Sequence, residues 1–114
     1  MLNKKNPTTT KSWNNLRRQY EKTKNLHMRT LFAEDPRRFD RFSIRFNDLI
    51  VDYSKNRITQ ETLKVLIALA EECDLKKAIE NVFSGAKINE TENRAVLHIA
   101  SVSYTHLTLP TITE

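Results

Sequence analysis

The side chains best suited to hold a metal ion are three histidines, His27, His98 and His106, and the single cysteine, Cys73. Two imidazoles share one helix face, and so one ion, when they lie three or four residues apart. The three histidines do not have that spacing, and none of them clusters in the sequence with Cys73. We therefore predict no metal site, and we expect Cys73 to be a small, buried apolar residue.

Two carboxylates, Asp48 and Asp52, fall on the same side of a predicted strand because their positions differ by an even number. Paired carboxylates can perform acid–base catalysis. Asp beside a turn commonly accepts hydrogen bonds from the backbone instead, and we favour that structural role. The chain also shows no combination of nucleophile, base and orienting acid. We predict no catalytic, cofactor-binding or metal-ligating residue here, and no cofactor.

The composition is that of a soluble, basic chain of 114 residues, in which 19 Lys and Arg against 14 Asp and Glu give a net charge of +5. This length suits one small domain or a part of a larger one. The single glycine excludes the Gly-rich loops that cradle phosphates. The chain therefore contains neither a nucleotide-binding P-loop nor a dinucleotide fingerprint.

Most of the positive charge lies in residues 1–46, and a basic region can attract nucleic acid. The alternative function is thus a stand-alone basic helical module that binds nucleic acid or another protein. The basic side chains spread over several predicted elements, so we favour a solvated surface and expect no nucleic-acid partner. They are Arg17, Arg18, Lys22, Lys24, Arg29, Arg37, Arg38, Arg41 and Arg45.

Three features of the sequence bear on its location in the cell. No apolar run approaches the roughly 20 residues that cross a bilayer. The N-terminal residues are basic and lack the apolar stretch of a secretory signal. A lone cysteine fits a reducing compartment. We expect a cytoplasmic protein that does not contact membranes.

The first third of the chain predicts two helices. Thr9 or Thr10 caps the first, over 11–24, whose apolar residues Trp13, Leu16 and Tyr20 form a narrow stripe. Asn25 is expected to cap a second, short helix that carries Leu26, Leu31 and Phe32. The pair Asp35-Pro36 ends it, because a residue before proline avoids the helical conformation.

Alternating apolar residues at Phe42, Ile44 and Phe46 predict a half-buried strand. Asn47-Asp48 is a plausible tight turn, and residues 49–51 form the returning strand. Thr59 caps a helix over 60–73, whose core face is Leu63, Leu66, Ile67 and Ala70.

Asp74 is expected to cap the next helix, and Gly85 to end it in a left-handed conformation. Asn89 and Glu92 have the spacing of a capping box, so a fifth helix is predicted to carry Ala95, Val96 and Ile99. The predicted fold class is mainly α with one short β-hairpin. The apolar face of the helix after Asp74 is Leu75, Ala78, Ile79, Val82 and Phe83.

Two long stretches are highly specific: VDYSKNRIT over 51–59 and FSGAKINETENRAVLH over 83–98. NPT stands near the start, LF and RF near 31–42, and ECDL before the second stretch. In order and spacing these motifs resemble the N-terminal region of glucose-6-phosphate isomerases, also called phosphoglucose isomerases. The resemblance covers roughly residues 5–100.

The resemblance implies an enzyme of glycolysis and gluconeogenesis that interconverts glucose 6-phosphate and fructose 6-phosphate. In that family a carboxylate base moves a proton between C1 and C2 through an enediol, without a metal or organic cofactor. The parent is an α/β protein of the sugar-isomerase type, with αβα layers. Its implied partners are the sugar phosphate, the remainder of the isomerase chain and a second subunit in a homodimer.

The family's chains are several times longer than this one. Their phosphate-binding loop, catalytic glutamate, ring-opening histidine and late lysine all fall beyond the equivalent of Ala100, and His98 does not correspond to the catalytic histidine. We therefore expect the 114-residue chain alone to be inactive. The expected organisation is a frayed N-terminus (1–8), the helical and hairpin segment of the isomerase (9–100) and a non-native tail, a sequencing or cloning scar (101–114).

Overall fold

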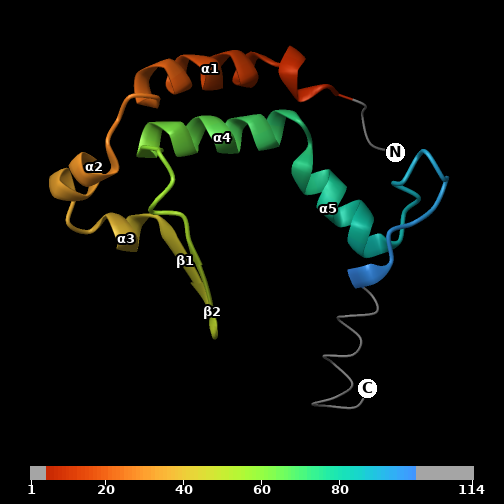
Figure 1. Cartoon of the computed structure of the whole chain (residues 1–114). Coiled ribbons are helices and arrows are strands. Elements are labelled where there is room, and N and C mark those ends of the chain that lie inside the picture. Colours follow the sequence, from red (N-terminus) through yellow and green to blue (C-terminus); the bar gives the residue numbers. More distant parts are fainter. Residues whose placement is uncertain (1–4, 100–114) are drawn as a thin grey trace. The chain divides into compact units, whose positions relative to one another are not determined.

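The computed structural model describes residues 5–99 and divides the chain into two compact units. The first, which we call the hairpin unit, covers residues 10–68. The second, the terminal unit, comprises residues 1–9 and 69–114, of which 5–9 and 69–99 are described. Figure 1 shows the elements of both. The predicted tail over 101–114, with His106, lies outside the described residues.

The hairpin unit begins with helix α1 (Lys11–Thr23). Thr10 is its N-cap, because the Thr10 hydroxyl accepts a hydrogen bond of 3.1 Å from the backbone N–H of Trp13. This confirms one of the two caps that the sequence predicts. Before it, a 3₁₀ turn, η1 (Pro7–Thr9), orders part of the segment expected to be frayed.

The second helix, α2 (Met28–Glu34), begins later than predicted. Asn25 is not its cap: Lys24 and Asn25 form the turn that ends α1, and Leu26 belongs to the connection. His27 caps α2 instead, because its Nδ1 accepts a hydrogen bond of 3.2 Å from the backbone N–H of Arg29. The helix ends before Asp35-Pro36, as predicted. A further single-turn helix, α3 (Arg38–Arg41), follows.

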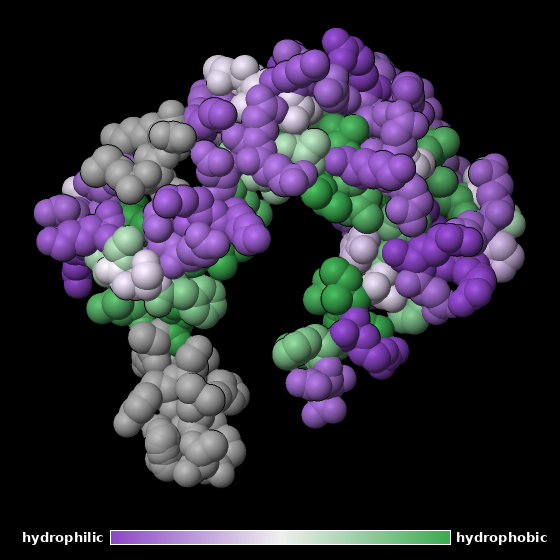
Figure 2. All heavy atoms as spheres, turned by 180° about the vertical axis from the view of Figure 1, so that it is seen from behind, coloured by the Kyte–Doolittle hydropathy of each residue, from purple (hydrophilic) through white to green (hydrophobic). Residues whose placement is uncertain are grey.

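The predicted hairpin is confirmed as strands β1 (Ser43–Phe46) and β2 (Leu49–Asp52), joined by Asn47-Asp48 and paired antiparallel with Phe46 opposite Leu49. The prediction of half-burial is wrong. Ile44 and Phe46 are 58% and 69% exposed, because nothing in the unit covers the face to which they point. Phe42 is buried, but it lies before the strand, at the end of α3. In Figure 2, apolar side chains reach the surface in the part of the molecule that carries the hairpin.

Helix α4 (Gln60–Glu72) begins at the predicted cap. The Thr59 hydroxyl accepts from the backbone N–H of Thr62, and the Thr62 hydroxyl accepts from the backbone N–H of Thr59. This reciprocal pairing satisfies two backbone donors at the start of the helix. The predicted core face of α4 is open, with Leu66 and Ile67 37% and 52% exposed.

In the terminal unit, α5 (Leu75–Ser84) is confirmed, but Asp74 does not cap it through its side chain. Asp74 takes a left-handed conformation with φ of 57° instead. Gly85 ends α5 with φ of 78°, as predicted. Its N–H donates to the carbonyl of Val82, and that of Ala86 donates to the carbonyl of Asn81, the pattern of a Schellman cap.

The fifth helix is wrong over Ala95 and Val96, which have no regular structure; residues 98 and 99 are helical. Asn89 and Glu92 do make the predicted contacts, since the Asn89 side chain accepts from the Glu92 N–H at 3.4 Å. These contacts close a turn instead of starting a helix, because Asn93 turns left-handed (φ 54°) and Arg94 pairs back to Asn89.

A usual protein core buries apolar side chains, but most of the buried residues in the described part are polar. Leu31 and Phe42 are the only buried apolar residues of the described part, whereas large hydrophobic residues are exposed on α1, α4, α5 and both strands. No helix of the described part is long and apolar enough to span a bilayer. The buried polar residues are Thr10, Ser12, Gln19, Thr23, Arg38, Ser54 and Thr62.

Candidate functional site

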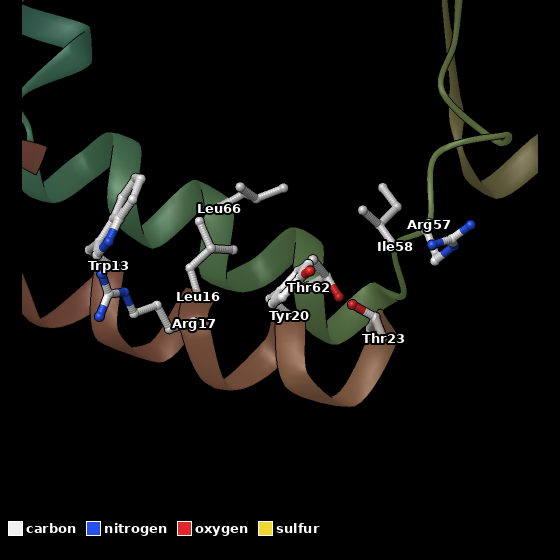
Figure 3. A pocket seen from close by; sticks show the side chains of 9 residues that line it. All are labelled: Trp13, Leu16, Arg17, Tyr20, Thr23, Arg57, Ile58, Thr62 and Leu66. Atoms are coloured by element: carbon white, nitrogen blue, oxygen red, sulfur yellow. The ribbon is translucent and has the colours of Figure 1, made fainter. Parts of the chain in front are cut away.

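An apolar groove runs between α1 and α4 in the hairpin unit, with a volume of about 380 Å³. Figure 3 shows its side chains, which come from both helices and from the segment before α4. The predicted stripe on α1 forms one wall because residues 13, 16 and 20 lie on one helix face. The lining residues are Trp13, Leu16, Arg17, Tyr20, Thr23, Arg57, Ile58, Thr62 and Leu66.

Trp13 leaves one polar atom of the groove without a partner. Its indole Nε1 is buried and has no hydrogen-bond acceptor among the described residues. A buried donor in this state costs about 1–3 kcal/mol. At the Trp13 end, the contact between α1 and α4 therefore leaves one hydrogen-bond donor without an acceptor.

Polar contacts between α1 and the first turn of α4 tie the two helices together. The Gln19 amide donates to the Glu61 carboxylate, and the Thr62 hydroxyl donates to the Gln19 amide oxygen at 3.4 Å. Lys22 lies 3.4 Å from the same carboxylate. The Gln19 hydrogen bond, and then Lys22, lower the pKa of Glu61 from its usual value. These contacts fix the relative position of the two groove walls.

Arg38 shapes the segment that brings Arg57 and Ile58 to the groove. Its side chain is buried, and its guanidinium donates to the carbonyls of Ser54 at 2.7 Å, Asn56 at 2.7 Å and Ile58 at 3.0 Å. The planar fork of the guanidinium suits several acceptors at once. It also lies over the ring of Phe42, 4.5 Å from the centroid. We call Arg38, Phe42 and the three carbonyls the Arg38 hub.

The two carboxylates singled out in the sequence have structural positions. Asp48 lies in the hairpin turn. Asp52 accepts from the backbone N–H of Ser54 at 2.9 Å and from its hydroxyl at 2.6 Å, and it lies 3.3 Å from Lys55. The hydrogen bonds from Ser54 come first among the causes that lower the pKa of Asp52. The structure confirms the predicted backbone-bonding role for Asp52 and does not pair it with Asp48.

The described residues contain no group of three or more His, Cys, Asp or Glu side chains that could hold a metal ion. His27 is a helix cap, and His98 is exposed. Cys73 is a free thiol and only half-buried, so the prediction of full burial is wrong. It follows the last residue of α4, where the helix leaves it partly open.

Three of the basic residues that the sequence offers to a nucleic acid have local structural contacts instead. Arg38 is buried, Arg41 pairs with Asp35 at 2.8 Å, and Arg37 lies 3.4 Å from Asp40. Sequence reasoning missed the separate role of Arg38. The available signal was its position between Asp35-Pro36 and the aromatic residue four positions later, Phe42.

The family model of phosphoglucose isomerase matches residues 52–109, which include the α4 side of the groove. The chain belongs to this family. The match extends past residue 100, so the boundary of the tail stays a prediction. The five helices and the two-stranded hairpin agree with the predicted fold class, which is that of one part of a sugar-isomerase α/β protein.

Curated relatives named glucose-6-phosphate isomerase align over most of the chain. The protein of Christiangramia forsetii is 54% identical over 95 residues, 83% of this chain. That of Wigglesworthia glossinidia brevipalpis is 52% identical over 105 residues (91%), and that of Baumannia cicadellinicola is 56% identical over 96 residues (83%). The aligned part is 18%, 19% and 17% of these relatives, so the chain spans less than a fifth of their length.

Proposed function

We propose that this chain is the N-terminal part of a glucose-6-phosphate isomerase and serves that enzyme as scaffold. The observation that carries the proposal is an identity of 52–56% to three such isomerases over at least 83% of the chain. The full-length enzyme interconverts glucose 6-phosphate and fructose 6-phosphate. It opens the sugar ring and moves a proton between C1 and C2 through an enediol.

None of the 114 residues is catalytic in this proposal. Among the described residues, the groove between α1 and α4 is lined mainly by apolar side chains, with no carboxylate that could act as a base. The acidic side chains with lowered pKa values, Asp52 and Glu61, accept structural hydrogen bonds. A carboxylate with a lowered pKa is a weaker base, which is the wrong direction for proton abstraction.

The same proposal covers the partners and the location. The substrate is the sugar phosphate of the full-length enzyme, which needs no cofactor and acts as a homodimer in the cytoplasm. In this proposal, residues 9–100 contribute packing surfaces to the full-length enzyme, and residues 101–114 are a non-native tail.

The test begins with the coding DNA, read onward across the codon for Ala100. We expect the frame to continue into an isomerase-like sequence. The encoded full-length protein should convert fructose 6-phosphate to glucose 6-phosphate in a coupled dehydrogenase assay. A genomic frame that ends at Glu114 would overturn the proposal of a longer enzyme.

The isolated 114-residue chain is assayed in parallel and should give no turnover above the blank. Loss of general acid–base catalysis alone lowers the reaction rate by a factor of roughly 10²–10⁴. Turnover by the short chain would show that the catalytic groups lie inside these residues, against the assignment made here.

A further inference from the structure

We propose that the groove between α1 and α4 is the docking site for an amphipathic, acidic helix of the same polypeptide, from the part of the full-length chain that continues after residue 100. The inference rests on the proposed function, because it takes the chain to be part of a longer isomerase. It assigns a specific occupant to one surface of the scaffold. The apolar side of that helix would lie on the groove floor, and its carboxylates would face Arg17 and Arg57.

The shape and chemistry of the floor fit a helix. Leu16 and Tyr20 on α1 and Leu66 on α4 supply its apolar side chains, with Ile58 toward one end (Figure 3). Tyr20 remains 62% exposed and Leu66 37% exposed. An apolar groove between two helices can accept the i, i+3, i+4 and i+7 side chains of a third.

The charge of the groove selects an acidic occupant. Arg17 and Arg57 are its charged lining residues, and the lining contains no carboxylate. Complementary charge at the rim of an interface sets orientation and excludes wrong partners. A helix with carboxylates beside its apolar stripe therefore fits, and a basic helix does not.

The unpartnered indole of Trp13 marks the groove as incomplete. The described residues supply no acceptor for its buried Nε1. Buried side-chain donors in finished proteins almost always have a partner. A segment that arrives at this end of the groove with a carbonyl or carboxylate oxygen would supply the missing acceptor after a small turn of the ring.

The length of the related isomerases indicates that the docked helix comes from the remainder of the same chain. The aligned region is only 17–19% of each related isomerase, so more than four-fifths of their length lies outside it. The α4 side of the groove falls within the family match, which covers residues 52–109, so this wall belongs to the part of the chain shared with the family. An occupant from that chain is present at high effective concentration and needs no separate partner.

The experiment uses the full-length protein with the substitution Arg17→Lys, which keeps the charge and adds a primary amine at the rim. A carbodiimide then joins this amine to a carboxylate in direct contact, and mass spectrometry identifies the linked residue. The matched control is Arg18→Lys, the next residue of α1, which is not part of the groove lining. Lys22 and Glu61, 3.4 Å apart, provide an internal positive control in both variants.

We expect the Arg17→Lys variant to link to an acidic residue in the part of the full-length chain after residue 100, with a yield several-fold above that of Arg18→Lys. Mixing ¹⁵N-labelled with unlabelled subunits shows whether the link lies within one polypeptide. No link to the part of the chain after residue 100, while the Lys22–Glu61 link forms, would overturn the proposal. So would equal yields from the two variants, or a link that joins two subunits.

The isomerase activity of the unsubstituted full-length protein is measured separately. An active enzyme without the cross-link removes only the groove assignment. A cross-link in a protein without isomerase activity removes only the proposed function.

Discussion

The Arg38 hub and the β-hairpin lie next to each other in the sequence and are opposite in character. At the hub, Arg38 is 3% exposed and all of its described contacts are polar or aromatic. On the hairpin, Phe46 and Leu49 face each other across the strands and are 69% and 68% exposed. The charged side chain of Arg38 is thus buried, whereas the apolar side chains of Phe46 and Leu49 are exposed to solvent.

This reversal indicates which surfaces the unit completes by itself. Within the hub the buried guanidinium and the backbone carbonyls of residues 54, 56 and 58 satisfy one another, because buried polar groups must be paired. Contiguous exposed apolar side chains are typical of surfaces that contact another protein segment. The hub therefore holds the local conformation, and the hairpin is free to serve as a contact surface.

The largest expected effect comes from Arg38→Met, which keeps the volume of the stem and removes the guanidinium. Three carbonyls then lose a charged donor, and each such hydrogen bond contributes about 1.5–3 kcal/mol. We expect the free energy of unfolding to fall by at least about 3 kcal/mol, allowing for non-additivity. Urea unfolding followed by circular dichroism measures the change.

The neighbouring substitution Arg37→Met is the matched control. Arg37 is exposed and lies 3.4 Å from Asp40, a surface pair expected to contribute less than about 1 kcal/mol. Equal losses for the two variants would mean that the hub has no special role in stability.

A smaller effect is expected at Thr10, another buried polar residue. Thr10→Ala removes the oxygen that accepts from the Trp13 N–H at the start of α1. Loss of such a cap costs about 1 kcal/mol, which should appear as a lower urea midpoint. Thr9→Ala is the control, since Thr9 is exposed and does not cap α1. A Thr9→Ala effect as large as that of Thr10→Ala would contradict the assignment of the cap.

Local rules predicted most of the elements because each depends on neighbours in the sequence. The Thr10 and Thr59 caps, the Gly85 C-cap and the stop at Asp35-Pro36 all act within one helical turn. The errors at Asn25 and after Glu92 share one cause. In both places a turn occupies residues that were expected to start a helix, and sequence spacing does not distinguish a turn from a helix start.

Burial was the part that the sequence did not predict. The alternation at Ile44 and Phe46 indicates a strand with one apolar face, and this holds, but periodicity does not say whether anything covers that face. The groove was visible only as a stripe on α1, because its second wall is Leu66, fifty residues after Leu16. The role of Arg38 depends on carbonyls 16 to 20 residues away in sequence.

Asp52, at the end of β2, joins the hairpin to Ser54 of the Arg38 hub, and its contribution to stability should depend on pH. Hydrogen bonds from Ser54 lower the pKa of Asp52 in the folded chain, so this residue stabilises the fold above the usual Asp pKa of about 3.9. That contribution is lost as the pH falls through the lowered pKa. We expect the urea midpoint to drop between pH 7 and pH 3, and to drop less in Asp52→Asn.

Glu61→Gln provides the comparison, since the pKa of Glu61 is lowered in the same direction by Gln19 and Lys22. The two substitutions should each remove a separate part of the acid sensitivity, because the two carboxylates share no partner. A pH dependence unchanged in Asp52→Asn would show that the Ser54 hydrogen bonds do not stabilise the folded chain.

The smallest effect on stability is expected on the hairpin. Phe46→Thr keeps a residue that favours strands and removes an exposed ring, so the free energy of unfolding of the 114-residue chain should change by no more than about 0.5 kcal/mol. Self-association, measured by sedimentation velocity over a range of concentrations, should fall, because the exposed apolar pair is lost. Arg45→Thr, on the other face of β1, should not reduce it. A large loss of stability in Phe46→Thr would mean that the hairpin ring is already packed within this chain, and the contrast with the Arg38 hub would then disappear.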